Sequence, residues 1–353
     1  MKKKIYINGR FLSQNLTGVN RYAYELTKNL NKLNIDFYII VPKNIMLNPE
    51  YNIDTFKFIK YGVGGSHFWE QLILPFFFLF KKNYVLLNFT GLSSILIRNR
   101  IMTIHDLAFL ENPKWYSNKY YYLYKYLTPI AAKTAKKIIT VSEFSKKEII
   151  HRLKIKEQKI SVIYNAVDHF KKNNVNSKNL DNKQYILTVA SIDPRKNFKT
   201  IIDAFLLLEK NMNIELYIVG GQSKNIFSKI DIKKNSKIHI LGRVTDKELE
   251  KYYRNANMFM YMSFYEGFGI PPLEAMRFNC PVIVSDIPVF HEVYADAAVY
   301  INPYDTFEIS NSIKKLYYNK ELRTELIEKG EKQVKKFSWK HSTETLINLL
   351  NKM

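Results

Sequence analysis

The chain has 353 residues, of which 46% are hydrophobic and 24% charged, and its formal net charge is +22. Because domains commonly have about 100–200 residues, this length predicts two domains, each with its own core. A single cysteine, Cys280, excludes a disulfide-built scaffold. The basic start leads straight into a strand, and the most apolar run, residues 72–80, is too short to cross a bilayer, so we expect a cytoplasmic protein.

The positive charge comes mostly from lysine, since only ten of the 54 basic residues are arginine. Nucleic-acid readers usually rely on arginine, so a basic nucleic-acid-binding protein without catalysis is a remote alternative. Between Lys114 and Lys159, twelve basic residues stand against three glutamates and are interleaved with tyrosines. This pattern suits an anionic membrane surface, and the alternative is a general lysine excess that is simply solvated.

Short β-branched runs alternate with helical patterns along the first half of the chain. We expect strands at residues 4–8, 37–41, 84–89, 101–105, 137–142 and 160–165. Helices are expected between them, at residues 19–33, 68–80, 118–136 and 145–153. Such alternation is typical of a parallel sheet joined by helical crossovers.

A polar segment separates this half from a second alternating half. Residues 169–183 are rich in Asn and Lys, lack an apolar period and predict a linker. Strands are then expected at residues 185–190, 214–220, 237–242, 257–263, 281–286 and 297–302, and two or three helices in the last 50 residues. The predicted α/β organisation is a Rossmann-like domain at 1–172, a linker at 173–183, a second Rossmann-like domain at 184–336 and a final segment at 337–353. Two doubly wound sheets would face a deep cleft and bind ligands at the carboxyl ends of their strands.

The stretch YMSFYEGFGIPPLEAM (261–276) places two glutamates eight residues apart. Glu266 follows a buried strand in a glycine loop, and Glu274 lies in the first turns of a helix that two prolines open. Gly267 and Gly269 would let backbone N–H groups approach a ligand, and the helix N-terminus favours a phosphate. These features suit a nucleotide-sugar; the alternative is a solvated Glu266 and a Glu274 that only complements the helix dipole.

Further candidates stand at strand ends. Arg195 and Lys196 follow the first strand after the linker, where paired cations suit a diphosphate. Gly18, between the first strand and first helix, could bring the backbone near a phosphate or sugar. His105, before Asp106 at another strand end, could hydrogen-bond or polarise a substrate hydroxyl.

The motif HFWEQLILP (67–75) carries two residues of a different kind. Trp69 is expected to pack in the core, and an acceptor-site role for Glu70 is left open. The chain has no Asp-x-Asp pair, no His/Cys ligand cluster and no glycine-rich nucleotide motif. We therefore expect no metal and no cofactor, and predict that Arg195 and Lys196 neutralise the diphosphate.

Together these motifs resemble the retaining glycosyltransferases of family 4, which have the GT-B architecture. EGFGIPPLEAM is similar to the family's E-x7-E motif, and TGVNRYAYEL, HFWEQLILP, TIHDLAF and IDPRKN extend the resemblance along most of the chain. IDPRKN and FWEQLILP look most like bacterial mannosyltransferases of O-antigen and capsule assembly. The resemblance therefore implies GDP-mannose as donor, with UDP- or dTDP-sugars as alternatives. A nucleotide-sugar epimerase or a phosphorylase on the same fold is a further alternative, but the additional sites that these enzymes need are not evident.

The resemblance also implies a role for each matched residue. Arg195 and Lys196 would hold the diphosphate, Glu274 the nucleotide ribose and Glu266 the donor sugar. The remaining donor-site residues would lie beside the sugar and phosphates or at the reaction centre: Gly18, His105, Gly267, Phe268 and Gly269. The final segment would be a helix that crosses back to the first domain. The implied reaction adds a hexose, with retention, to a growing surface glycan, plausibly linked to polyprenyl diphosphate at the inner membrane face.

Overall fold

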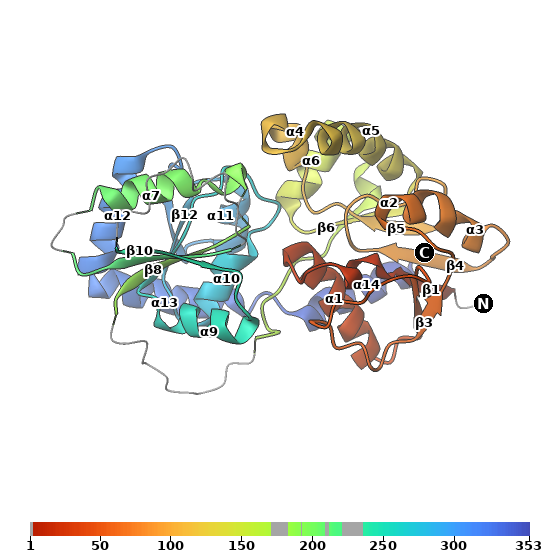
Figure 1. Ribbon diagram of the computed structural model, residues 1–353, viewed down its shortest axis with the longest axis horizontal. Helices are drawn as coiled ribbons and strands as arrows, with labels where there is room; N and C mark the ends of the chain where they lie inside the picture. Colours follow the sequence, from red (N-terminus) through yellow and green to blue (C-terminus); the bar gives the residue numbers. More distant parts are fainter. Residues whose placement is uncertain (1–2, 171–182, 192, 209–211, 221–235) are drawn as a thin grey trace. The chain divides into compact units, whose positions relative to one another are not determined.

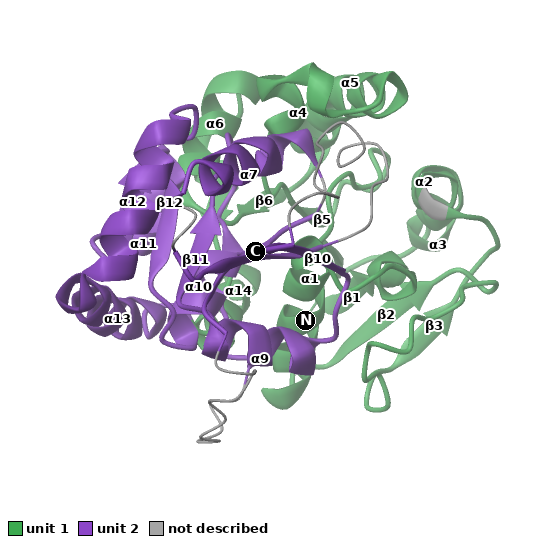
Figure 2. Cartoon of the chain, turned by 60° about the vertical axis from the view of Figure 1, so that its left-hand side comes forward, with its two compact units in different colours: residues 1–165, 338–353 green, residues 166–337 purple. Residues whose placement is uncertain are grey.

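The computed structural model describes residues 3–170, 183–191, 193–208, 212–220 and 236–353. The chain forms two compact units, residues 1–165 with 338–353 (unit 1) and residues 166–337 (unit 2), which Figure 2 distinguishes by colour. Unit 2 thus begins at residue 166, whereas the sequence analysis ends the first domain at 172. The expected linker at 173–183 lies outside the described residues, apart from residue 183.

Unit 1 is built on a parallel sheet, whose described strands stand in the order β3-β2-β1-β4-β5-β6-β7 (Figure 1). These strands are Lys4–Asn8 (β1), Phe37–Val41 (β2), Phe58–Lys60 (β3), Tyr84–Asn88 (β4), Arg100–Thr103 (β5), Lys137–Thr140 (β6) and Ile160–Val162 (β7). All but β3 were expected. β3 has three residues and lies at the sheet edge, half-buried, so its sequence carries little of the apolar signal of a central strand.

Helices cover both faces of this sheet. They are α1 (Gly18–Lys32), α2 (Ser66–Phe68), α3 (Leu74–Phe78), α4 (Ala108–Glu111), α5 (Asn118–Thr134), α6 (Glu143–Leu153) and α14 (Trp339–Asn351). A π-helical turn, Trp69–Ile73, joins α2 to α3, and short 3₁₀ turns occupy Gly9–Ser13, Pro113–Trp115 and Glu157–Lys159. The C-terminal helix α14 packs on α1, where the rings of Trp339 and Tyr22 lie 5.9 Å apart. Ser342 also donates a hydrogen bond to the carbonyl oxygen of Tyr164.

Unit 2 repeats the plan with the described strands in the order β10-β9-β8-β11-β12-β13, again all parallel. The strands are Tyr185–Val189 (β8), Glu215–Val219 (β9), Ile238–Gly242 (β10), Met258–Tyr261 (β11), Val282–Ser285 (β12) and Ala298–Ile301 (β13). The helices are α7 (Phe198–Leu206), α9 (Asp246–Asn255), α10 (Ile270–Arg277), α11 (Pro288–Tyr294), α12 (Thr306–Tyr318) and α13 (Lys320–Val334). Helices α7 and α12 pair over one core, which contains Ile202, Met260 and Ile313, and α10 pairs with α13.

The strand order reverses once within each sheet. In unit 1 the chain runs from β1 to β2 on one side of β1, and β4 and β5 lie on its other side. In unit 2 the same reversal occurs between β8 and β11. The loops that leave two such neighbouring strands diverge, and open α/β sheets bind ligands in the resulting crevice at the strands' carboxyl ends. These two reversal points are therefore where site residues are expected.

Gly269, which precedes α10, is fixed by its surroundings. Its φ is 87°, and a Cβ atom there would lie 2.2 Å from the Tyr294 hydroxyl and 2.6 Å from a Phe290 ring atom. The Tyr294 hydroxyl is itself held, since it donates to the Gly269 carbonyl oxygen at 2.6 Å. Both the left-handed backbone conformation and the close packing of Phe290 and Tyr294 therefore require a glycine at this position.

We expect Gly269→Ala to lower the free energy of unfolding by about 2–4 kcal/mol, because left-handed strain and overpacking add. Urea denaturation measures the change. Gly65→Ala is the matched control: its Cβ would meet no atom within 4 Å, so a change below about 0.5 kcal/mol is expected. Equal stabilities for wild type and Gly269→Ala would contradict the packing argument.

Candidate functional site

Two cations lie where the chain leaves β8. Arg195 and Lys196 belong to the 3₁₀ turn Pro194–Lys196, which Asp193 caps by accepting the Arg195 backbone N–H at 2.8 Å. Asn197 then adopts a left-handed conformation, with φ of 55°, and starts α7. Its side chain donates to the carbonyl oxygen of Pro303 at 2.8 Å, which fixes the bend. The turn thus holds both cations at the carboxyl edge of the sheet.

Glu266, from the loop after β11, meets both cations. Its Oε2 lies 3.0 Å from Arg195 Nη1, and its Oε1 accepts a hydrogen bond from Lys196 Nζ. The Tyr261 hydroxyl joins them, accepting from Lys196 at 2.8 Å and donating to Glu266 Oε1 at 3.0 Å. Arg195 Nη1 also donates to the Tyr265 carbonyl oxygen at 2.8 Å. Residues that the sequence analysis selected from separate motifs are therefore joined at the β8/β11 reversal.

The charges in this cluster determine the protonation states of Glu266 and Tyr261. Burial would raise the pKa of Glu266, but the positive charges of Arg195 and Lys196 outweigh burial and lower that pKa to about 2. Burial and the neighbouring Glu266 carboxylate raise the pKa of Tyr261 well above its usual range. Glu266 is therefore an anion and Tyr261 a neutral phenol at physiological pH. Two cations face the Glu266 carboxylate, and the Asp193 carboxylate also acts on Lys196.

Glu274 occupies a separate environment. It is buried in α10, and its Oε2 accepts a hydrogen bond from the Tyr253 hydroxyl at 2.8 Å, while its Oε1 lies 3.9 Å from His169 Nε2. Glu274 thus does more than complement a helix dipole, because a buried carboxylate needs specific partners. Burial and Glu274 itself raise the pKa of Tyr253, which remains a hydrogen-bond donor.

The glycine loop before α10 contains a buried aromatic residue, Phe268, whose donor-site role stays a prediction. The Phe268 side chain is buried and packs edge-on against Phe337, with ring centroids 5.5 Å apart, so it fills the core of unit 2. Pro271 and Pro272 fall in the first turn of α10 and supply no N–H groups there. The backbone donors available at this helix start are consequently those of the glycine loop and the residue after it.

The two remaining candidates belong to unit 1. His105 follows β5, and its Nε2 donates to the Phe89 carbonyl oxygen at 2.8 Å. Burial lowers the pKa of His105, although Phe89 and Asp106 oppose the shift, so the neutral ring keeps Nδ1 as an acceptor. Gly18 is the exposed first residue of α1 and has helical backbone. Their roles toward a donor stay predictions.

The structure adds partners that the sequence analysis missed. Tyr261 and Tyr253 each hold one of the two glutamates, and both are buried aromatic residues that a sequence pattern assigns only to the core. A tyrosine at the end of the strand preceding the glycine loop was the available signal. Within the described ranges, no three His, Cys, Asp or Glu side chains gather as a possible metal site.

Solved structures share the fold over nearly all of the chain. HepE from Anabaena, in complex with UDP and glucose, has a TM-score of 0.78 and 13% sequence identity, with 100% of each chain covered. WaaG, a glycosyltransferase involved in lipopolysaccharide biosynthesis, has a TM-score of 0.75 and 13% identity, covering 98% of this chain and 99% of WaaG. At these identities the likeness concerns the fold, which is the two-domain GT-B architecture.

Sequence relatives are closer. The O-antigen chain mannosyltransferase RfbU of Salmonella typhimurium is 36% identical over 225 residues, which cover 63% of this chain and 62% of RfbU. The O-antigen chain mannosyltransferase B of Escherichia coli is 30% identical over 268 residues, covering 71% of this chain and 70% of that protein. The matched region spans only 32% of the serotype-specific mannosyltransferase WbdA of Escherichia coli, at 26% identity.

Family descriptions match both halves of the chain. Residues 16–170 match "Glycosyltransferase Family 4", and residues 169–333 match "Glycosyl transferases group 1". The second match contains the Arg195–Lys196–Glu266 cluster and Glu274, and the first contains Gly18 and His105. With these matches and relatives, the chain belongs to the glycosyltransferases of family 4, whose second domain is of the group 1 type.

Proposed function

We propose that this protein is a retaining, metal-independent glycosyltransferase that moves mannose from GDP-mannose to a hydroxyl of a growing bacterial surface glycan. The observation that carries the proposal is the joining of Arg195 and Lys196 to Glu266 at the β8/β11 reversal. In the proposed complex the two cations bind the donor's diphosphate, and Glu266 contacts the donor sugar. Glu274 binds the nucleotide ribose.

The charge balance of the cluster supports a diphosphate ligand. Arg195 and Lys196 share the Glu266 carboxylate and are both largely buried, and a bound anion would offset part of the free-energy cost of burying them. Arg195 offers a planar fork of N–H groups, and Lys196 a compact charge, which are the two complementary ways of holding phosphate oxygens. This supplies the charge neutralisation that a leaving diphosphate needs without requiring a metal ion.

The proposed step is a front-face substitution. The acceptor oxygen forms a bond to the anomeric carbon on the face from which the diphosphate departs, the bond between that carbon and the phosphate oxygen breaks, and the acceptor proton moves to the departing diphosphate. Arg195 and Lys196 stabilise the charge that develops on the leaving group. Retention follows because the new bond forms on the face that the leaving group vacates.

The identity of donor and acceptor rests on the relatives. RfbU and mannosyltransferase B are O-antigen chain mannosyltransferases by name, which supports mannose as the sugar and a surface glycan as the acceptor. GDP as the base follows from the resemblance, and the HepE complex with UDP and glucose makes a UDP-sugar the alternative. The acceptor is proposed to be linked to polyprenyl diphosphate.

We also propose that the protein works at the anionic inner face of the cytoplasmic membrane. No helix in the described part of the chain is long and apolar enough to cross a bilayer. Helix α5 exposes Tyr120, Tyr122, Tyr126 and Ile130, and Lys125 lies over the ring of Tyr121 at 5.1 Å. Exposed tyrosines beside lysines suit the headgroup region of an anionic membrane.

Nucleotide binding tests the donor site. We expect GDP at a hundred times its Kd to stabilise the protein by about 2.7 kcal/mol in a thermal-shift experiment, and EDTA to leave that shift unchanged. Arg195→Leu and Lys196→Met should each weaken GDP binding about 10- to 100-fold, because each removes a charge-assisted hydrogen bond. Lys199→Met, at an exposed lysine on α7, should bind GDP as the wild type does. A larger shift with UDP or dTDP would contradict GDP as the nucleotide of the donor. No shift with any of the three would contradict the proposed donor site.

Glu266→Gln tests the carboxylate in two ways. Transfer should fall about 10²–10³-fold, since an anionic group at the reacting sugar is lost. In the wild type the lowered pKa of Glu266 stabilises the fold above pH about 4.5, and this stabilisation, on the order of 3 kcal/mol, disappears as the pH falls towards about 2. The variant should lack this part of the acid dependence, whereas the exposed-site control Glu344→Gln should retain it. Near-normal transfer by Glu266→Gln would contradict the assigned role.

Vesicle binding tests the membrane surface. Reversing the lysine charges of residues 119–137 to glutamate should abolish most sedimentation with vesicles that contain anionic lipid, since each basic residue contributes about 1 kcal/mol. Five charge reversals serve as the control of equal net charge and should reduce binding less: Lys314 and Lys315 on α12, Lys320 and Lys332 on α13, and Lys335 directly after α13. If both variants sediment like the wild type, α5 is not the membrane-binding element.

A further inference from the structure

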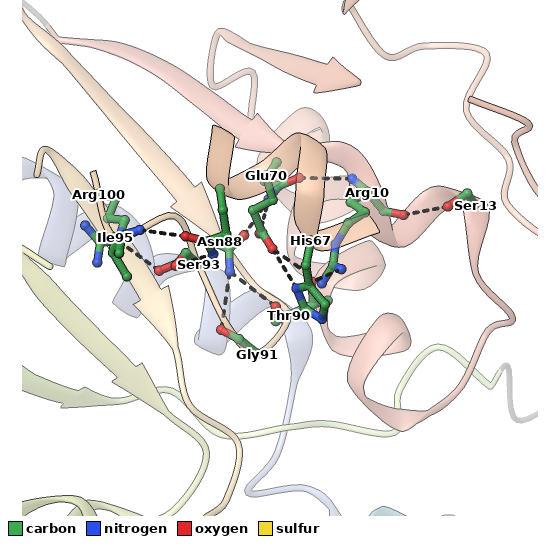
Figure 3. A network of polar contacts seen from close by, with 12 residues as sticks. Arg10, Ser13, His67, Glu70, Asn88, Thr90, Gly91, Ser93, Ile95 and Arg100 are labelled. Atoms are coloured by element: carbon green, nitrogen blue, oxygen red, sulfur yellow. Dashed lines mark hydrogen bonds and ion pairs between the residues drawn. The ribbon is translucent and has the colours of Figure 1, made fainter. Parts of the chain in front are cut away.

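A second buried charged cluster lies at the β1/β4 reversal of unit 1 (Figure 3). Asn8 ends β1 and Asn88 ends β4, and Asn8 Nδ2 donates to Asn88 Oδ1 at 2.7 Å and to Glu70 Oε1 at 2.6 Å. Asn8, Asn88 and Glu70 are all buried, with Glu70 fully so. This point of the first sheet corresponds in topology to the place where unit 2 holds Glu266.

The π-helical turn Trp69–Ile73 positions Glu70. Trp69 Nε1 donates to the Tyr61 carbonyl oxygen at 2.8 Å, and Gln71 Nε2 donates to the Ser93 carbonyl oxygen at 3.1 Å. The residues on both sides of Glu70 are therefore anchored, and Glu70 itself reaches the ends of β1 and β4. Single π-turns inside helices are rare and often occur at functional sites.

The Glu70 carboxylate is only partly satisfied. Its Oε2 lies 3.7 Å from Arg10 Nη2 and 3.5 Å from His67 Nδ1, and no described residue gives this buried oxygen a hydrogen bond. Arg10 Nη1 donates to His67 Nδ1 at 3.4 Å, which places the proton of the neutral ring on Nε2. A buried oxygen in this state costs free energy that a ligand hydroxyl would recover by donating to it.

An aromatic surface borders the charged groups. The His67 ring meets Tyr124 of α5 edge-on at 6.0 Å, and Tyr124 stacks on Tyr120 at 4.1 Å. The Tyr124 hydroxyl also approaches Gly91, whose carbonyl oxygen accepts from Asn88. About a third of the His67 side chain is exposed, as is part of Tyr120, so these two side chains form the solvent-facing edge of the cluster, while Glu70 is fully buried.

The group that lacks a hydrogen bond distinguishes this cluster from the one in unit 2. Here it is the carboxylate oxygen Oε2 of Glu70, whereas both carboxylate oxygens of Glu266 accept hydrogen bonds from Arg195 and Lys196. A carboxylate oxygen repels a phosphate and accepts hydrogen bonds from hydroxyl groups. The cluster suits a neutral ligand with several hydroxyls, which donate to the carboxylate and accept from N–H groups, and with an apolar face that packs on aromatic rings.

We propose that His67, Glu70 and Tyr124 form the binding site for the terminal sugar of the acceptor glycan. His67 Nε2 donates to one sugar hydroxyl, and Glu70 Oε2 accepts from a neighbouring hydroxyl. Arg10 orients the His67 ring, and Tyr124 packs on the sugar's apolar face. This inference rests on the proposed transferase function and specifies its acceptor side.

The test uses octyl α-D-mannopyranoside as the acceptor probe, below its micelle-forming concentration. Transfer from GDP-mannose and calorimetric binding are measured for the wild type, Glu70→Gln and His67→Ala. Each variant should raise the KM and Kd for the glycoside about 10- to 100-fold, because each removes one hydrogen bond to a charged or buried group. The stabilisation by GDP should stay at the wild-type value in both. His151→Ala, at an exposed histidine on α6, should match the wild type in all measurements.

The outcomes separate this inference from the proposed function. If GDP does not stabilise the wild type, the proposed function is contradicted. GDP binding without glycoside binding by the wild type, or unchanged KM and Kd in both variants, overturns the acceptor site alone. A fall in kcat with unchanged KM also overturns it, because a purely structural defect would lower activity without selecting the acceptor. The isosteric glutamine keeps the bond from Asn8, so the folded state of Glu70→Gln is retained.

Discussion

The constraint on which the rest depends is the reversal of strand order in each parallel sheet. Parallel strands need crossovers of one hand, so connections that run to opposite sides of a sheet leave on opposite faces, and the loops part at the reversal. Backbone groups there have no neighbouring strand to cover them, and side chains from both loops converge. In unit 2 the loops after β8 and β11 bring Arg195 to Glu266. In unit 1 the ends of β1 and β4 bring Asn8 to Asn88, and a helical segment adds Glu70.

Neither charged cluster is explained by stability. Burying an ion pair costs about as much desolvation free energy as its attraction returns, so apolar residues of similar volume would hold these positions at least as well. A bound ligand of complementary charge would offset the free-energy cost of burying these charged groups. For this reason we interpret the clusters as binding sites. In unit 1 the buried group that lacks a hydrogen bond is a carboxylate oxygen of Glu70, so we infer a ligand with hydroxyl groups there.

Much of the fold follows from local sequence, but several contacts do not. Buried parallel strands consist of apolar, β-branched runs such as FYIIV and YVLLN, which have few other interpretations, so their positions were predictable. The edge strand Phe58–Lys60 lacks that signal because it is half-buried. Arg195 and Glu266 could be selected as candidates since each follows a strand, but Tyr261 could not, because its contact with Lys196 forms only when β11 pairs with β8. The sequence predicts that Gly269 lets the backbone approach a ligand, which stays a prediction, whereas the packing of Phe290 and Tyr294 against it cannot be seen in a local pattern.

The two tyrosines explain how the glutamates of one motif come to differ. Burial and the adjacent carboxylates keep Tyr253 and Tyr261 protonated, so each phenol can only be a fixed donor to its glutamate. For Glu266 the tyrosine acts together with two cations, Arg195 and Lys196. For Glu274 the phenol donates to Oε2, and His169 Nε2 lies 3.9 Å from Oε1. Eight residues of spacing therefore place one carboxylate in a cluster with two cations and the other beside a buried tyrosine hydroxyl.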